Sequence, residues 1–212
     1  MKHEWRKHEK EIYLPKKDVP VIIDVPSMKY IVIKGEGSPA SKFFSECIEA
    51  LYMLSYGVKM GLKKDENVTD YFEYTVYPLE GVWDLNEEGR ELYKDKKTVI
   101  DIKEFFKFEL MIRQPNFLTK DLFLKVVESV YKKKKNELVK EAIFVENIEG
   151  LCAQILHIGS YDNEPESFDK LEEFIISNGY KRSFKTHREI YLSDARKVTP
   201  DKLKTTLRVK IK

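Results

Sequence analysis

The sequence has few cysteines and no long hydrophobic run. Cys47 and Cys152 lie in apolar segments without a Cys or His at metal-ligand spacing nearby, so we expect buried thiols in a reducing compartment and no metal site. The apolar runs are only a few residues long, and the N-terminal segment lacks the apolar stretch of a signal peptide. These absences predict a cytoplasmic protein with no membrane partner.

Net charge is also nearly absent. The 38 Lys and Arg residues are balanced by 36 Asp and Glu residues, which leaves a formal charge of +2. Such a chain has no strong field to hold a phosphate backbone, so we expect no direct binding of nucleic acid. No Gly-rich phosphate loop, zinc spacing or Ser-His-Asp signature is present, so no nucleotide, metal or other cofactor is implied. The 42% hydrophobic residues are enough for a real core.

The chain divides into a lead-in and two similar halves. Residues 1–27 are polar and punctuated by prolines, which predicts an extended segment with at most one strand, too short for a helix-turn-helix domain. Residues 28–114 and 148–212 each show the order strand, helix, strand, strand, and a helical connector covers 115–147. We therefore predict a single domain, residues 28–212, made of two βαββ repeats.

Individual elements follow from hydrophobic periodicity and turn residues. The expected elements are strand 30–33, a helix from Ser38 that ends near Gly57 or Gly61, strands 71–77 and 104–112 separated by a loop over 78–101, strand 150–158, helix 165–179, and strands 187–192 and 206–211. Gly37 matches Gly159, and Tyr77 matches Tyr191. The predicted fold is α+β, with the copies around a pseudo-twofold axis and antiparallel sheets with helices on one side. A ligand cleft is expected between the copies, on the sheet face opposite the helices.

The most distinctive group of polar residues in the sequence lies on the expected strand 187–192. A two-residue period places His187, Glu189 and Tyr191 on one side of it. A carboxyl group among aromatic rings suits proton transfer or the binding of a desolvated cation, so Glu189 is the first catalytic candidate and Tyr191 the second. The alternative is an exposed Glu189 paired with Arg188 or Lys185, and spacing alone slightly favours it.

Further ligand-binding candidates are aromatic or titratable. Trp83, on the expected loop, could close over a flat ligand, whereas His157, at the end of a buried strand, is more typical of a structural histidine. Glu146 and Glu80 are expected in loops, either at the surface or on a rim over the cleft, and the face of Glu109 is ambiguous. The full set of ligand-binding candidates is Tyr77, Trp83, Phe108, Glu109, Glu146, His157 and His187.

Five separated segments carry a resemblance to a known family. They are Asp24-Val25-Pro26-Ser27-Met28 before Gly35-Glu36-Gly37, then Tyr77 to Trp83 (YPLEGVW), Met111 to Pro115 (MIRQP), Gln154 to Gly159 (QILHIG) and His187 to Asp194 (HREIYLSD). Together they resemble the GyrI-like small-molecule-binding family, whose fold is also called SOUL-like. The resemblance runs from about Pro15 to Ile211 and implies two βαββ copies around a ligand cleft.

The resemblance also implies functions. In drug-sensing relatives an acidic residue on a pocket strand holds flat cationic drugs, and Glu189 is the matching position. Stand-alone relatives include hydrolases that open the cyclopropane ring of DNA-alkylating cyclopropanoids; there Glu189 would deprotonate water, and Tyr191 or another phenol would hydrogen-bond the conjugated carbonyl. Two departures, Asp84 after Trp83 and Phe108 where a Trp is frequent, indicate a different pocket shape.

These observations favour a binding protein for hydrophobic, planar or cationic small molecules. Hydrolysis of cyclopropanoids is a further activity that the resemblance implies, and the residues alone leave open whether a bound ligand is turned over. The alternative is a protein-interaction inhibitor without catalytic activity, similar to a gyrase inhibitor. That function needs an apolar patch or an acidic surface, and mixed charges favour neither. The protein is expected as a monomer or homodimer with a small-molecule ligand.

Overall fold

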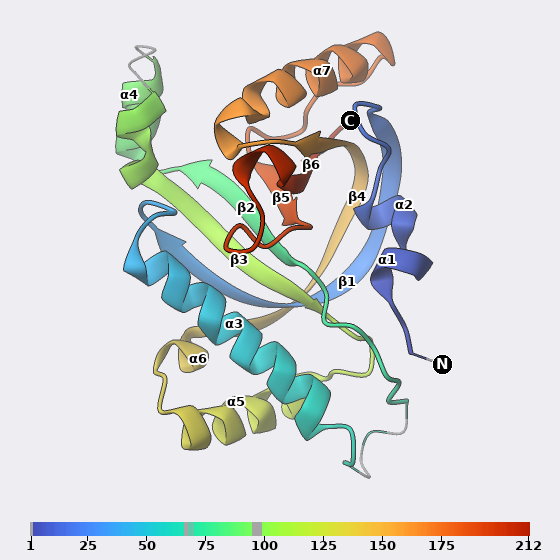
Figure 1. Cartoon of the computed structure of the whole chain (residues 1–212), viewed down its shortest axis with the longest axis vertical. Helices are drawn as coiled ribbons and strands as arrows, with labels where there is room; N and C mark the ends of the chain where they lie inside the picture. Colours follow the sequence, from blue (N-terminus) through green and yellow to red (C-terminus); the bar gives the residue numbers. More distant parts are fainter. Residues whose placement is uncertain (1, 66–67, 69, 95–98) are drawn as a thin grey trace.

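The computed structural model describes residues 2–65, 68, 70–94 and 99–212 (Figure 1). Its six strands form a closed antiparallel barrel in the order β1-β3-β2-β5-β6-β4. The strands are β1 (Val21–Glu36), β2 (Leu79–Leu85), β3 (Phe106–Gln114), β4 (Ile143–Ile158), β5 (His187–Tyr191) and β6 (Lys204–Lys210). The α+β prediction with antiparallel strands is confirmed, and the two sheets join into one barrel.

Helices surround this barrel. They are α1 (Trp5–His8), α2 (Lys10–Tyr13), α3 (Lys42–Gly61), α4 (Glu87–Lys94), α5 (Lys120–Lys134), α6 (Leu138–Glu141) and α7 (Glu164–Ser177), with short 3-10 turns η1 (Val99–Phe105), η2 (Tyr161–Asn163) and η3 (Pro200–Lys202). None of the helices in the described part of the chain is long and apolar enough to cross a membrane.

Helices α3 and α7 cover the outer face of the barrel. The hydroxyl of Ser41, rather than Ser38, accepts the Phe44 N–H and starts α3. Cys47 and Leu51 on its apolar face then pack in the core that includes β1 and β3. On the other half, Leu171 and Ile175 of α7 pack against outward-facing residues of β4 and β6. Both helices therefore lie on one side of the barrel wall.

The segment 71–77, expected as a strand, contains only an isolated bridge between Tyr74 and His3. The strand of this half is β2, which lies inside the segment expected as a loop and follows directly on Pro78. The aromatic residues that led to the prediction of a strand over 71–77 pack in the core without a strand, since Tyr74 and Tyr77 are both buried there.

Strand order is symmetric about the β2–β5 pair, as a duplication of βαββ units requires. Gly37 and Gly159 follow β1 and β4, both with positive φ (113° and 145°), and are matched as predicted. The residue pairs between neighbouring strands extend this match from β1 and β4 to β2 and β5. Gly81 is then equivalent to Glu189, and Trp83 is equivalent to Tyr191. The expected equivalence of Tyr77 and Tyr191 is therefore wrong.

The lead-in closes one end of the barrel instead of being purely extended. It contains α1 and α2, and β1 already begins at Val21. Backbone carbonyl groups of residues 11–13 accept hydrogen bonds from Gln154, Arg208 and Thr206 inside the barrel. The N-terminal helices thus satisfy polar groups that would otherwise be buried without partners.

A cluster of buried charged side chains lies in the barrel interior. The Arg188 guanidinium contacts Glu80 at 2.7 Å and Glu149 at 2.9 Å, and Arg208 contacts Glu149 at 2.9 Å. Burial raises the pKa of Glu80, which is fully buried, so its expected surface position is wrong. Since these charges are buried, their mutual pairing is a condition of the fold.

Candidate functional site

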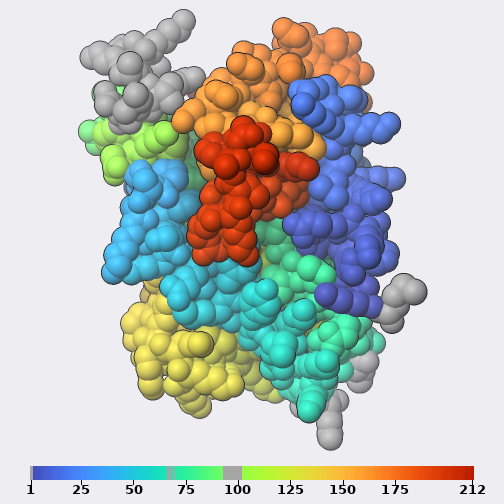
Figure 2. All heavy atoms as spheres, in the orientation of Figure 1, coloured from blue at the N-terminus to red at the C-terminus, as the bar shows by residue number. Residues whose placement is uncertain are grey.

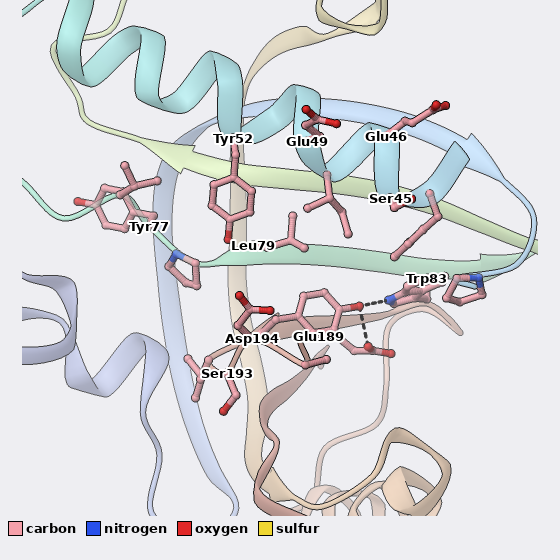
Figure 3. A pocket seen from close by; sticks show the side chains of 18 of the residues that line it. Ser45, Glu46, Glu49, Tyr52, Tyr77, Leu79, Trp83, Glu189, Ser193 and Asp194 are labelled. Carbon is pink, nitrogen blue, oxygen red and sulfur yellow. Dashed lines mark hydrogen bonds between the residues drawn. The ribbon is translucent and has the colours of Figure 1, made fainter. Parts of the chain in front are cut away.

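A long groove crosses β2 and β5 on the outside of the barrel, between α3 and α7 (Figure 3). The segment after β5, which follows Leu192 and lines the groove with Ser193 and Asp194, lies between these two helices on the surface (Figure 2, red). The cleft was expected on the face opposite the helices, and this is wrong. That opposite face is the barrel interior, which the ionic cluster occupies.

The strand β5 positions the central polar residues. As the two-residue period predicts, His187, Glu189 and Tyr191 line the groove, while Arg188 points into the barrel. Glu189 is only 9% exposed, and Arg188 is engaged by Glu80 and Glu149. The alternative of an exposed Glu189 paired with Arg188 therefore does not describe this structure.

Both carboxyl oxygens of Glu189 have a hydrogen-bonding partner. The Tyr191 hydroxyl donates to Oε2 at 2.8 Å, and His187 Nε2 lies 3.0 Å from Oε1. Phe168 of α7 holds the His187 ring edge-on, with the ring centroids 4.8 Å apart. These two contacts fix the orientation of Glu189 in the groove.

Trp83 extends this hydrogen-bonded chain to β2. Its Nε1–H donates to the Tyr191 hydroxyl oxygen at 2.9 Å, a contact drawn in Figure 3. Trp83 lies on a strand and not on a loop: its ring stacks on Phe44 at 5.7 Å and meets the edge of Phe106 at 5.5 Å. Trp83 is therefore a fixed wall of the groove, and it cannot close as a lid.

Tyr191 uses its single hydroxyl proton within the protein. The hydroxyl accepts from Trp83 and donates to Glu189, and burial, followed by the negative charge of Glu189, raises the pKa of Tyr191 well above its usual value. Tyr191 therefore holds Glu189 in place and remains protonated. Its ring still contributes to the aromatic lining, edge-on to Tyr161 with the centroids 6.1 Å apart.

Glu164 is a functional candidate that sequence reasoning missed. It lies in the first turn of α7, lines the same groove and is only 7% exposed. Burial, followed by the charges of Glu189 and Asp162, raises the pKa of Glu164 to about 9. Acidic residues in the first helical turn are common at surfaces, so only the tertiary packing reveals this one.

Two other candidates, Tyr77 and Phe108, line the aromatic groove or support it. Tyr77 lines one end, opposite Trp83 in Figure 3, and its hydroxyl donates to Glu9 at 3.1 Å. The guanidinium of Arg113 covers the Tyr77 ring at 4.6 Å. Phe108 is buried behind Trp83, with the ring centroids 5.9 Å apart.

The remaining candidates lie outside this groove. His157 is buried, with Nδ1 at 2.9 Å from the Ser167 hydroxyl and Nε2 at 3.0 Å from a backbone carbonyl oxygen. Glu109 pairs with Lys34, and Glu146 accepts a hydrogen bond from a serine. Both glutamates border a smaller cavity of about 400 Å³ that also reaches Arg188 and Arg208. The groove thus brings together Trp83, His187, Glu189 and Tyr191, with Tyr77 at its end.

Comparisons with known proteins agree with this geometry. Residues 19–212 match the family described as GyrI-like small molecule binding domain. Among solved structures, a hydrolase from Listeria innocua has a TM-score of 0.88 and 29% identity and covers 100% of both chains. A second hydrolase structure from Listeria innocua has a TM-score of 0.86 and 27% identity, with 99% of this chain and 100% of that chain covered. No curated protein matches the chain.

A more distant likeness extends to one further solved structure. The C-terminal domain of EcmrR has a TM-score of 0.51 at 12% identity, with 92% of this chain and 97% of that chain covered. At this identity the likeness concerns the fold alone.

Proposed function

The chain belongs to the GyrI-like small-molecule-binding domain family, and from that premise we propose that its groove binds planar, hydrophobic compounds and hydrolyses those with a strained electrophilic ring. Cyclopropanoid alkylators are the substrate class in mind. The observation that carries the proposal is the hydrogen-bonded chain from Trp83 through Tyr191 to Glu189 on an aromatic floor. The two Listeria innocua hydrolases support the choice of a hydrolytic reaction.

Glu189 is the base in this proposal. Each carboxylate oxygen has two acceptor sites, so either can accept a hydrogen bond from water in addition to those from Tyr191 and His187. Glu189 removes a proton as the water oxygen bonds to a cyclopropane carbon. The ring C–C bond breaks, and its electron pair moves into the conjugated carbonyl group, which becomes a phenolate.

Positioning explains why this carboxylate can act. Tyr191 and His187 prevent rotation of Glu189, and Trp83 prevents rotation of Tyr191. A base held in this way loses less orientational freedom on reaching the transition state. The aromatic wall also excludes bulk water from a bound planar ligand.

Binding without turnover is the second candidate function. An ionised Glu189 among aromatic rings favours flat cations, which interact with both the carboxylate charge and the ring faces. In either case the protein would meet its ligands in the cytoplasm, where its buried cysteines, Cys47 and Cys152, remain thiols.

Incubation of the purified protein with a cyclopropanoid alkylator tests the proposal, with substrate loss followed by chromatography. Glu189→Gln should lower turnover by about 10²-fold or more. Glu166→Gln is the matched control, because Glu166 is an exposed carboxylate outside the groove. Substrate loss that is equal in the wild type and in Glu189→Gln would overturn the assignment of the base. A flat cationic dye that binds while the alkylator survives would favour the binding function, and neither signal would favour the protein-interaction inhibitor.

A further inference from the structure

Glu164 is a buried carboxyl group of the groove to which the reaction described above gives no role. It is 7% exposed, and its Oε1 is fully buried without a hydrogen-bonding partner. A buried polar atom without a partner costs stability, so its presence in a ligand groove points to a partner that arrives with the ligand.

The two carboxyl groups of the groove have different surroundings. The Tyr191 hydroxyl donates a hydrogen bond to Glu189 Oε2, and His187 Nε2 lies 3.0 Å from Glu189 Oε1. Glu164 has no such donor at Oε1, and it faces the charges of Glu189 and Asp162. Burial and these charges raise the pKa of Glu164, so its neutral, protonated form is the stable one.

Opening of a ring conjugated to a carbonyl group needs a hydrogen-bond donor at the carbonyl oxygen. Tyr191 cannot supply this donor without giving up its bond to Glu189. A protonated Glu164 has one O–H group in the same groove. Glu164 can therefore donate a hydrogen bond to the carbonyl oxygen of the substrate, while Glu189 activates the water at the cyclopropane ring.

We propose that Glu164, as a neutral carboxylic acid, is the proton donor of the groove, and that its ligands are neutral planar molecules with a conjugated carbonyl group. The inference rests on the proposed function and deepens it. In this proposal the groove recognises its ligand by a carbonyl oxygen that accepts a hydrogen bond, and not by a positive charge on the ligand.

The proton transfers in this reaction balance. Glu189 takes a proton from water while the new C–O bond forms and the ring C–C bond breaks. Glu164 gives its proton to the carbonyl oxygen, which becomes a phenol. Glu164 ends ionised and Glu189 ends protonated, and exchange of one proton with solvent restores the starting state. The net charge of the groove stays constant during the step. Burial and the charge of Glu189 raise the pKa of Glu164 to about 9, near the ordinary phenol value of about 10, so the transfer is nearly balanced.

Other charged groups along this wall of the groove act on the pair as well. Asp162 pairs with Lys103 at 3.2 Å. The remaining titratable and charged groups on the neighbouring elements are Tyr161, Arg182, Lys185, His187 and Tyr191. None of them donates a hydrogen bond to Glu164 Oε1.

Two measurements that do not depend on turnover test the inference. The carboxyl ¹³C resonances of protein labelled at glutamate are followed from pH 5 to 10, and Glu164→Gln identifies the Glu164 signal. An unreactive planar analogue with the conjugated carbonyl but without the cyclopropane ring is titrated by fluorescence. We expect the Glu164 signal to titrate far above those of the exposed glutamates, and Glu164→Ala to weaken binding of the analogue about tenfold. Glu164→Gln, which keeps an N–H donor, should bind nearly as the wild type does, and so should the control Glu166→Gln.

Turnover of the alkylator adds a third measurement. Glu164→Gln should lower kcat by about 10²-fold with little change in KM, and it should lose the fall in rate above pH 9. The inference is overturned if Glu164 titrates with the exposed glutamates, or if Glu164→Ala binds the analogue as tightly as the wild type. A wild-type protein that leaves the alkylator intact refutes the proposed hydrolysis instead, while the resonance and the binding of the analogue still decide the role of Glu164.

Discussion

Gly81 lies directly across the β2–β5 ladder from Glu189, and it leaves room for the hydrogen bond that connects the two strands. A Cβ atom at position 81 would lie 2.9 Å from Trp83 Nε1 and 3.2 Å from the Tyr191 hydroxyl oxygen. The symmetry of the barrel relates these two positions, yet one is a bare backbone and the other is a carboxylate. The site is therefore asymmetric in a symmetric fold.

Gly81→Ala should separate Trp83 from Tyr191. The added methyl group pushes both side chains aside, which leaves the orientation of Glu189 less fixed, so we expect turnover to fall about tenfold and stability to fall by about 1–3 kcal/mol. Thermal denaturation and the alkylator assay measure the two effects. Gly61→Ala, at the open end of α3, is the control, and it should leave turnover unchanged without lowering stability, because alanine favours a helix more than glycine does. Unchanged turnover in Gly81→Ala would show that the Trp83–Tyr191 bond has no role in the site.

Tyr191→Phe removes one hydroxyl that serves two partners. The nearly buried Trp83 N–H loses its acceptor, and Glu189 loses a donor. We expect a loss of about 1–3 kcal/mol in the free energy of unfolding, measured by urea denaturation, together with slower turnover. Tyr180→Phe, outside the groove, is the matched control. A variant as stable as the wild type would contradict the hydrogen-bonded chain.

Stability should depend on pH through Glu164. The folded chain raises the pKa of this carboxyl group from 4.5 to about 9, so the folded state binds the proton more tightly than the unfolded state does. The contribution of Glu164 to the free energy of unfolding is therefore full below about pH 4.5. It is lost as the pH rises through about 9, at up to about 1.4 kcal/mol per pH unit. Glu164→Gln should flatten this decline, as measured by chemical denaturation between pH 5 and 9. Parallel curves for the wild type and the variant would contradict a raised pKa.

The ionic cluster inside the barrel gives a prediction about stability alone. Arg188→Met leaves Glu80 without its partner in a fully buried position, so we expect a loss of about 3–5 kcal/mol. Adding Glu80→Gln to this variant should recover part of the loss, because the unpaired charge is removed. Denaturation of the single and double variants provides the test, and a double variant less stable than Arg188→Met would argue against charge burial as the cause.

The strand β5 shows what the sequence could predict. Its alternation of residues separates His187, Glu189 and Tyr191 from Arg188 and Ile190, so their two faces follow from periodicity alone. Helices α3 and α7 were predicted for the same reason, because their apolar residues recur at helical spacing. Which face becomes the groove depends on closure of the barrel, a long-range property that local patterns do not contain.

The strand β2 shows the limit. Glu80 points into the barrel and Gly81 carries no side chain, so Leu79–Leu85 lacks the hydrophobic alternation of a buried strand. The partner that makes Glu80 tolerable, Arg188, lies 108 residues away. Glu164 was missed for a similar reason, since its burial depends on how α7 packs and not on its own segment.

The two faces of the barrel wall have a consequence for how such a protein can change over evolutionary time. Along β2 and β5, successive residues alternate between the ionic interior and the ligand groove. Replacement of a groove residue therefore leaves the charged residues of the interior in place. Replacement of an interior residue likewise leaves the side chains that line the groove unchanged. Selection can alter which compounds the protein accepts while the scaffold that keeps it folded is inherited unchanged.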